Sequence, residues 1–317
     1  MKSFHIKKIS QINQEKLKQF YLNTFKYERS IHDNYAWRYR LGFNDFEPIA
    51  LIVDDEISGH AGLMPIDLKI NNKIEKSIWF TDFFIEKKYR SLGYGKLLTE
   101  AWMKICPLQI TLCNEHSLKI FKKLNWSHNN NFIRKIKIFN YLNVMPILRR
   151  SNSSSLQIKG EVKSLKIENL NNTTISKLVN LSEKKLSNQK TGLVRDENWF
   201  KWRILDCPYK KDIFIFSYNN IYLVIHNLKK NNLNILNVIY SSDEISSDLI
   251  KALSIFSKNN NIDYLAFVKK KSSLIDGLLP GDRKINFAFY SKNSSDVSQI
   301  NQYLNDIQYI DSDLDFI

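Results

Sequence analysis

Residues 89–98, YRSLGYGKLL, bring Arg90, Gly93 and Gly95 together directly before an apolar helical pattern. The first N–H groups of a helix have no partner within the helix and carry about half a positive charge. Such a helix start binds anions, and phosphates in particular. Glycine has no side chain that would hold a phosphate away from these N–H groups. The segment therefore predicts a phosphate-binding turn.

Two common phosphate-binding loops are excluded by the residues around the glycines. A Walker A loop requires Gly-Lys followed by Ser or Thr, whereas Gly95 and Lys96 are followed by Leu97. A dinucleotide-binding turn requires a third glycine three residues after the second, where this chain has Leu98. The pattern that remains is a strand, then Arg-x-x-Gly-x-Gly, then a helix.

The elements that must position this turn are the strand before it and an amphipathic helix after it. The helix predicted over residues 95–105 has one apolar stripe that can pack on a sheet, formed by Tyr94, Leu97, Leu98, Ala101, Trp102 and Ile105. Further helices are predicted over residues 14–24, 31–41 and 117–124. Strands are predicted over residues 4–9, 49–54, 58–70, 77–85, 108–112 and 132–139. Because strands first follow one another and later alternate with helices, we predict a mixed sheet.

The composition is typical of packed domains. The 317 residues suffice for two ordinary domains, and 43% apolar with 13% aromatic residues excludes a disordered chain. No apolar run reaches the roughly 20 residues of a membrane helix, and the N-terminal residues lack the apolar core of a signal peptide. The three cysteines have neither disulfide-framework nor zinc-site spacing, so no metal is predicted. We expect a soluble, cytoplasmic protein without membrane insertion.

The formal net charge of +15 favours anionic partners. Lysines are spread along the whole chain, and no recognised nucleic-acid module is present, so we expect no dedicated nucleic-acid surface. A phosphorylated cofactor fits the glycine turn better.

The two halves of the chain share one pattern. Trp-Arg pairs at residues 37–38 and 202–203 each lie in a predicted helix that precedes two strands joined by a tight polar turn. We interpret these tryptophans as core residues and the arginines as flanking charges. Later in each half a strand is followed by a short predicted helix, which Asn125 or Gly281 can close in a left-handed conformation.

We therefore predict two tandem domains, residues 1–148 and 162–317, that arose by duplication. The serine-rich residues 149–161 between them are typical of a linker. Chance similarity between two unrelated α/β domains is the alternative.

At these residues the sequence resembles a known family. Residues 85–98, IEKKYRSLGYGKLL, look like the acyl-CoA pyrophosphate loop of the GNAT superfamily of N-acyltransferases. Residues 114–126, NEHSLKIFKKLNW, resemble its Asn-x-x-Ser/Ala-x-x-x-Tyr-x-x-x-Gly-Phe segment. With the strand order, the resemblance covers residues 2–139. It implies an α/β (α+β) fold of two tandem GNAT-like domains, each a mixed, largely antiparallel sheet flanked by helices.

The resemblance also implies which residues hold the cosubstrate, an acyl-CoA and first of all acetyl-CoA. The CoA pyrophosphate would be bound at Arg90, Ser91, Leu92, Gly93, Tyr94, Gly95 and Lys96. The main chain of Phe83, Phe84 and Ile85 would pair with the pantetheine arm, where the sheet opens toward the strand at residues 108–112. Asn114 would approach the cofactor near the thioester.

Two positions depart from the family pattern. Phe121 stands at the place of a tyrosine that protonates the leaving thiolate, so solvent or another tyrosine would have to serve. Asn125 replaces a glycine, and asparagine tolerates the positive φ that this position requires.

Acyl transfer to an amine requires a group that takes the proton of the amine. Asp82, three residues before Ile85 on the same strand, is one candidate, either as a base or as an anchor for a cationic acceptor. His116 is the other, because imidazole titrates near neutral pH. In the alternative interpretation, Asp82 accepts hydrogen bonds from a neighbouring loop and His116 is an exposed residue at a helix start. His60 is less well placed.

The second half has no glycine turn before its corresponding helix. Asp243 and Glu244 stand there instead, and carboxylates repel a pyrophosphate from a helix start. We predict that this half keeps the fold and has lost CoA binding.

The function that follows is transfer of an acetyl or other short acyl group from acyl-CoA to a primary amine. The acceptor to be tried first is an amino sugar of surface-polysaccharide synthesis, a small molecule. One alternative is a tRNA-dependent aminoacyl transferase of the peptidoglycan-bridge kind, which the basic charge favours and the intact glycine turn disfavours. Another is a non-catalytic acyl-CoA-binding module, which Phe121 favours. The sequence predicts no oligomeric state.

Overall fold

The computed structural model describes residues 3–25, 31–43, 45–140, 165–230, 232–270, 282–304 and 306–311. The predicted linker at residues 149–161 and the short helix expected before Gly281 lie outside these residues. The helices are α1 (Gln14–Thr24), α2 (Ile31–Arg38), α3 (Tyr94–Ile105), α4 (Glu115–Lys123), α6 (Asn172–Ser187), α7 (Glu197–Phe200), α8 (Ser247–Asn259) and α9 (Ser294–Tyr303). The strands are β1 (Phe4–Lys8), β2 (Ile49–Val53), β3 (Glu56–Ile70), β4 (Lys73–Ile85), β5 (Leu108–Cys113), β6 (Ser127–Ile138), β7 (Leu165–Glu168), β8 (Thr191–Leu193), β9 (Ile213–Tyr218), β10 (Ile221–Lys230), β11 (Leu233–Ser241), β12 (Tyr264–Lys270) and β13 (Arg283–Ser291).

The chain divides into two compact units that are not continuous in sequence. The first unit comprises Met1–Asn129, Lys190–Val194 and Phe287–Leu304, and the second comprises the remaining segments. The domains predicted from the sequence were single stretches, residues 1–148 and 162–317. The difference arises because strands far apart in the sequence can pair. β8 pairs with β3, which is why residues 190–194 belong to the first unit. The boundaries between the units also fall within β6 and β13.

The sheet of the first unit runs in the order β1-β2-β3-β4-β5-β13. The pairs from β1 to β4 are antiparallel, and β4 pairs with β5 in parallel. The turn between β3 and β4 contains Asn71 and Asn72, both with positive φ. Two successive residues of this kind make the tight turn that fits the twist of a hairpin. The predicted mixed, largely antiparallel sheet is thus confirmed.

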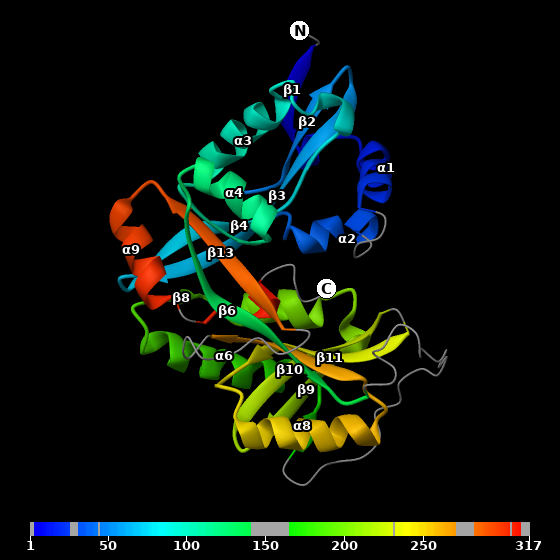
Figure 1. Ribbon diagram of the computed structural model, residues 1–317, viewed down its shortest axis with the longest axis vertical. Helices are drawn as coiled ribbons and strands as arrows, with labels where there is room; N and C mark the ends of the chain where they lie inside the picture. Colours follow the sequence, from blue (N-terminus) through cyan, green and yellow to red (C-terminus); the bar gives the residue numbers. More distant parts are fainter. Residues whose placement is uncertain are drawn as a thin grey trace. The chain divides into compact units, whose positions relative to one another are not determined.

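Helices cover both faces of this sheet (Figure 1). On one face α3 packs through Tyr94, Leu98 and Trp102, as its apolar stripe predicts, and Phe121 of α4 joins the same core. On the other face Leu17 and Tyr21 of α1 form a second cluster with residues of α2. The residue that ends α4, Asn125, has a φ of 60°, which confirms the expected left-handed conformation.

The second unit has a sheet in the order β6-β12-β11-β10-β9-β7. Here β11 and β12 are parallel and the helix between them, α8, packs on the sheet through Leu249, Leu253 and Phe256 (Figure 1). The other pairs in this order are antiparallel. The parallel strand–helix–strand arrangement of β4, α3 and β5 therefore recurs as β11, α8 and β12.

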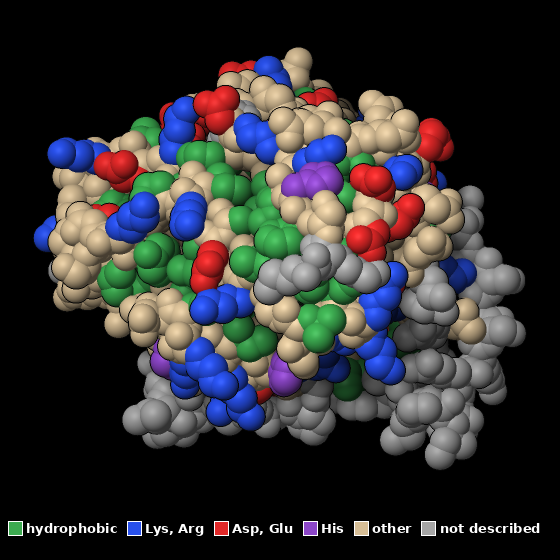
Figure 2. Space-filling model, turned by 90° about the horizontal axis from the view of Figure 1, so that it is seen from above, with side chains coloured by type: hydrophobic (Ala, Val, Ile, Leu, Met, Phe, Trp, Pro, Cys, Tyr) green, Lys and Arg blue, Asp and Glu red, His purple; other side chains and the backbone are tan. Residues whose placement is uncertain are grey.

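None of the helices among the described residues is long and apolar enough to cross a membrane. On the face seen in Figure 2, lysine and arginine side chains lie among acidic, apolar and uncharged ones.

Candidate acyl-CoA site

The turn between β4 and α3 has the backbone that its glycines predict. After a short 3-10 turn at Lys87–Tyr89, Ser91 and Gly93 both adopt positive φ, of 64° and 88°. Gly93 is the residue before α3 and has no side chain with which to cap the helix. A Cβ at Gly93 would meet no atom of the described residues within 4 Å, and one at Gly95 would meet only Ile85, at 3.8 Å. The space in front of the helix start is therefore open.

Two cations flank this helix start. Arg90 donates from Nε to the Ile85 carbonyl oxygen at 2.8 Å, and its guanidinium lies 5.9 Å from the centre of the Phe84 ring. Lys96 is 82% exposed and lies 3.8 Å from Glu100 across one helical turn. An exposed pair of this kind is weak, so Lys96 can turn to an incoming anion at little cost. The first turn of α3 thus combines main-chain donors with positive charge, which is the chemistry of phosphate binding.

The strands on either side of the turn diverge. Among the described residues the β4–β5 ladder consists of Ile78 with Gln109 and Trp79 with Ile110. The Thr111 hydroxyl then donates to the Phe80 carbonyl oxygen at 2.7 Å, and β4 continues to Ile85. The main chain that the sequence predicts to pair with a pantetheine arm therefore lies beyond the end of the ladder.

The three residues of that strand segment differ in exposure. Phe83 is 42% exposed, Phe84 is half-buried and Ile85 is buried in the core beneath α3. Because successive side chains of a strand point to opposite faces, Phe83 and Ile85 lie on the α3 side and Phe84 on the α1 side. Phe84 accordingly contacts Phe20 of α1, with ring centres 5.9 Å apart.

Asp82 lies in a bulge of β4 and is engaged in a buried ion pair. The β3–β4 register shifts between His60 and Gly62, and Asp82 has a φ of 49°. Its carboxylate accepts from Arg38 Nε at 2.8 Å and Nη2 at 3.1 Å, and from the Tyr39 hydroxyl at 3.0 Å. The side chains of Arg38 and Asp82 are each 5% exposed. Asp82 is therefore a hydrogen-bond acceptor, as in the alternative interpretation, but its donors come from the end of α2 and the next residue and not from a loop.

The same contact corrects the interpretation of the Trp-Arg pairs. Arg38 and Arg203 are 4% and 2% exposed, so neither is a flanking surface charge. Trp202 is buried as expected, whereas Trp37 is only half-buried. An arginine in the apolar face of a helix requires a carboxylate nearby, and this rule is the signal in the sequence that could have identified Arg38.

His60 connects the bulge to α1. Its Nδ1 lies 2.9 Å from the Asp82 carbonyl oxygen and its Nε2 lies 3.0 Å from the Tyr21 hydroxyl. Because a carbonyl oxygen only accepts, Nδ1 carries the proton and Nε2 accepts from Tyr21. Burial lowers the pKa of His60 to about 4, so the ring is neutral at pH 7. The sequence predicted that His60 is less well placed than Asp82 and His116, and the structure brings its ring into contact with the main chain of Asp82.

The remaining predicted site residues lie on α4 and at its start. Asn114 caps α4 by accepting from the Ser117 N–H at 2.8 Å, and His116 is exposed in the first turn. Phe121 is buried, with its ring centre 4.7 Å from that of Trp126. The turn residues 90–96 and the strand segment 83–85 are thus brought together, and His116 lies at the solvent-exposed start of α4, two residues after Asn114. No group of His, Cys, Asp and Glu among the described residues has the arrangement of a metal site.

Comparisons with known proteins support the fold. The sequence matches no family model and no curated protein. The structure is similar to a GCN5-related N-acetyltransferase from Kribbella flavida, with a TM-score of 0.60, 10% identity, and coverage of 91% of this chain and 71% of that one. It is also similar to a Saccharomyces cerevisiae N-myristoyltransferase with bound myristoyl-CoA, with a TM-score of 0.57, 13% identity, and coverage of 100% and 87%. A third similar structure is a GCN5-related N-acetyltransferase from Anabaena variabilis, with a TM-score of 0.57 and 13% identity. The match covers 90% of this chain and 72% of that one. The chain therefore has the fold of the GNAT superfamily.

Proposed function

We propose that this chain is an N-acyltransferase that moves a short acyl group, first of all acetyl, from acyl-CoA to a primary amine. The observation that carries the proposal is the open start of α3, where Gly93 and Gly95 leave the main-chain N–H groups uncovered beside Arg90. The similar N-myristoyltransferase holds an acyl-CoA, which supports this class of cosubstrate.

In this proposal the CoA diphosphate lies on the first turn of α3. Main-chain N–H groups between Arg90 and Lys96 donate to its oxygens, and the side chains of these two residues balance its charge. The pantetheine arm pairs with the main chain of Phe83–Ile85 beyond the β4–β5 ladder. Asn114 and Phe121, from the start and the core side of α4, complete the proposed site.

The chemistry is attack of a neutral amine on the thioester carbonyl. A C–N bond forms, the C–S bond breaks, and the amine loses a proton. We propose His116 as the group that takes this proton, because its side chain is exposed and Asp82 is already held by Arg38. The leaving thiolate takes a proton from water, since Phe121 has no hydroxyl to donate. An amino sugar is the proposed acceptor.

A second candidate is an acyl-CoA-binding module without catalysis. The buried ion pair of Asp82 and the phenylalanine at position 121 favour it, because Arg38 holds the Asp82 carboxylate and a phenyl ring has no proton to donate. The two candidates share the CoA site and differ in turnover.

The test of the CoA site compares two glycine variants. Gly93→Glu places a carboxylate in front of α3, and we expect calorimetry to show loss of CoA binding. Gly42→Glu is the matched control, because Gly42 also has positive φ, of 84°, and equally open surroundings among the described residues. The backbone strain is therefore the same in both variants. Unchanged CoA affinity in Gly93→Glu would remove the proposed site.

Turnover is then measured as free thiol released from acetyl-CoA in the presence of amines that include amino sugars. Release above the amine-free rate supports the transferase. CoA binding that Gly93→Glu abolishes, without release by any amine, supports the binding module.

A further inference from the structure

A cavity of about 320 Å³ opens in the second unit where β11 and β12 diverge. Their parallel ladder covers Ile235–Asn237 on β11, and β11 then continues to Ser241 while β12 continues to Lys270. The carboxyl ends of neighbouring parallel strands are the usual ligand sites of open α/β sheets. The volume lies at the lower end of the roughly 300–1,000 Å³ of small-molecule pockets, so a ligand must be compact.

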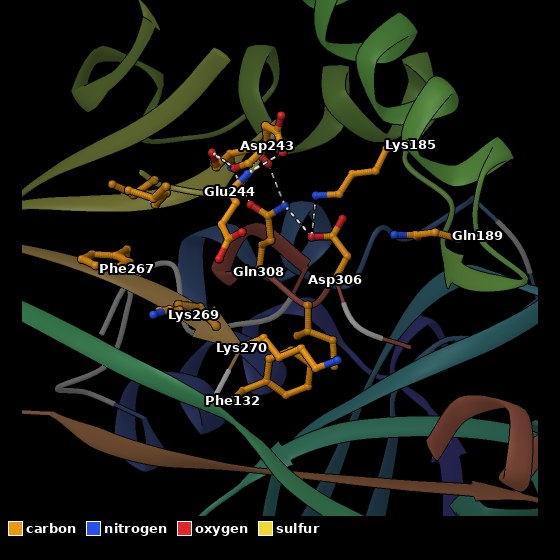
Figure 3. Close-up of a pocket in the computed structure, with 15 residues that line it drawn as sticks. Phe132, Lys185, Gln189, Asp243, Glu244, Phe267, Lys269, Lys270, Asp306 and Gln308 are labelled. Atoms are coloured by element: carbon orange, nitrogen blue, oxygen red, sulfur yellow. Dashed lines mark hydrogen bonds and ion pairs between the residues drawn. The ribbon is translucent and has the colours of Figure 1, made fainter. Parts of the chain in front are cut away.

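One wall of the cavity is acidic. Asp243 and Glu244 precede α8, and Figure 3 shows the Glu244 carboxylate directed into the cavity. The start of α8 is capped from within the chain, since the Ser246 hydroxyl accepts from the Leu249 N–H at 3.2 Å. This wall therefore attracts a cation, whereas the start of α3 attracts an anion.

The end of β12 is basic, and aromatic rings also line the cavity. Lys269 and Lys270 line the cavity at the end of β12. Phe132 and Phe267, both buried, also line it (Figure 3). A ligand that is complementary to the acidic, aromatic and basic parts of the lining carries a positive group, an apolar middle and a negative group.

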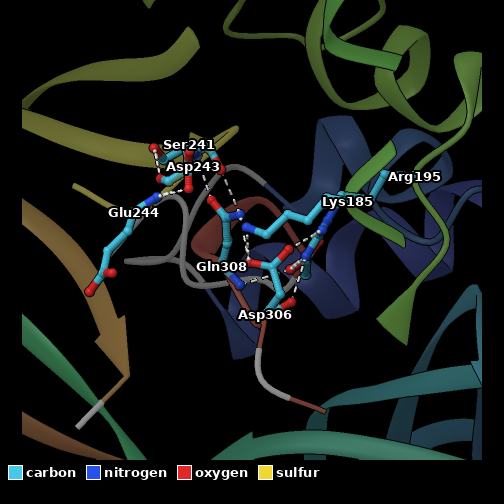
Figure 4. Close-up of polar contacts among 8 residues, drawn as sticks. Lys185, Arg195, Ser241, Asp243, Glu244, Asp306 and Gln308 are labelled. Carbon is cyan, nitrogen blue, oxygen red and sulfur yellow. Dashed lines mark hydrogen bonds and ion pairs between the residues drawn. The ribbon is translucent and has the colours of Figure 1, made fainter. Parts of the chain in front are cut away.

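The C-terminal segment fixes the edge of the cavity. The Gln308 side-chain amide accepts from the Ser241 N–H and donates to the Ser241 carbonyl oxygen at 3.0 Å (Figure 4). It also donates to Asp306, which pairs with Lys185 at 3.1 Å and with Arg195 at 2.8 Å. Since Gln308 already occupies the main chain of Ser241, a ligand must be recognised by side chains instead.

We propose that this cavity binds a compact zwitterion. Its protonated amine lies against Glu244, its anionic group lies against Lys269, and its apolar middle lies on Phe267, which shares one face of β12 with Lys269. The site is separate from the proposed acyl-CoA site, and its occupation does not depend on acyl transfer.

The test is calorimetry on the full chain, without CoA, with three matched probes. The zwitterion 6-aminohexanoate is compared with hexylamine, which lacks the acid, and with hexanoate, which lacks the amine. We expect the zwitterion to bind, and each single-charge probe to bind about tenfold more weakly, because one charge-assisted contact is lost. The shorter 4-aminobutyrate tests the span between the charged walls. Absence of binding by both zwitterions at millimolar concentration, or equal binding of hexylamine, overturns the proposal.

Matched variants locate the binding. Glu244→Gln is expected to weaken 6-aminohexanoate about tenfold while leaving hexanoate unchanged. Glu183→Gln is the control, because Glu183 is exposed on α6 and is not among the residues that line the cavity. Lys269→Met tests the site proposed for the anionic group of the ligand, and Lys258→Met on α8 is its control. Lys269→Met is expected to weaken 6-aminohexanoate about tenfold while leaving hexylamine unchanged. Equal affinity in Glu244→Gln and Glu183→Gln contradicts the assignment, provided that thermal unfolding shows both variants folded.

Discussion

The guanidinium of Arg38 on α2 is paired with the carboxylate of Asp82 in the β4 bulge, through hydrogen bonds of 2.8 and 3.1 Å. Both side chains are 95% buried, and Asp82 adopts positive φ. A non-glycine residue in this conformation persists only where its surroundings hold it. The pair therefore fixes the path of β4 just before the segment proposed to bind the pantetheine arm.

Removing one partner of this pair should be costly. We expect Arg38→Leu to lower the free energy of unfolding by about 3–5 kcal/mol, because Asp82 is left as an uncompensated buried charge. The double variant Arg38→Leu/Asp82→Asn should recover part of this loss, since asparagine is neutral and tolerates positive φ. Urea unfolding measures the free energy of unfolding of both variants.

The control is an exposed pair of the same unit. Lys16 and Glu56 lie 3.9 Å apart, with side chains 56% and 72% exposed. Lys16→Leu should therefore change the unfolding free energy by less than about 1 kcal/mol. A loss in Arg38→Leu as small as that in Lys16→Leu would mean that the buried pair does not hold the bulge.

His60 should make stability depend on pH. Burial lowers its pKa to about 4, against about 6.5 in an unfolded chain. Between these values the unfolded chain binds a proton that the folded chain does not, so stability falls as the pH falls from about 6.5 to 4. The contribution of this residue has a slope of up to about 1.4 kcal/mol per pH unit.

The measurement is urea unfolding of the wild type and His60→Gln between pH 7.5 and 4.5. His60→Gln is less stable at pH 7.5, and the gap should narrow as the pH falls. His128→Gln, at an exposed position of β6, should leave the pH dependence of the wild type unchanged. A gap between wild type and His60→Gln that is constant with pH would contradict the buried neutral ring.

The features predictable from the sequence are local ones. The glycine turn, the stripe of α3 and the left-handed Asn125 each depend on residues within a few positions, and the structure has all three. The catalytic assignments depend on long-range contacts. Arg38 and Asp82 are separated by 44 positions, and no local pattern indicates that they meet.

The unit boundaries were not predictable for the same reason. β8 has only three residues and pairs with Leu68–Ile70 of β3, more than a hundred positions earlier. Periodicity identifies a strand and not its partner. Lys190–Val194 and Phe287–Leu304 can therefore be assigned to the first unit only from the folded structure.

Arg195 should hold the C-terminal segment of the second unit in place. It donates to Asp311 at 2.6 Å and to Asp306 at 2.8 Å, and it is buried. Burial raises the pKa of the Asp311 carboxyl, although Arg195 opposes this shift. We expect Arg195→Met to cost about 3–5 kcal/mol and to speed amide exchange at residues 306–311. Lys201→Met, which removes an exposed pair with Glu197, should cost less than about 1 kcal/mol and leave that exchange unchanged.

Gly95→Ala should separate the requirements of the fold from those of the proposed CoA site. Among the residues that the structure describes, an alanine Cβ at this position meets only Ile85, at 3.8 Å, which is an ordinary contact. Alanine is the better residue in a helix, so we expect the free energy of unfolding to stay constant or to rise by about 0.5–1 kcal/mol. The methyl group adds bulk to the first turn of α3, whose N–H groups the proposed diphosphate approaches, so CoA should bind about tenfold more weakly.

Gly62→Ala is the opposite case within the same sheet. A Cβ there would lie 2.8 Å from the Thr81 carbonyl oxygen and 2.9 Å from the Tyr39 ring, so the backbone beside the bulge must shift. This variant should lose about 1–3 kcal/mol of stability. Urea unfolding and CoA calorimetry on both variants therefore distinguish a glycine that the packing of the fold requires, Gly62, from one that the proposed CoA site requires, Gly95. If Gly95→Ala bound CoA as tightly as the wild type, the first turn of α3 would tolerate a methyl group at this position, and the requirement for glycine at the proposed site would rest on Gly93.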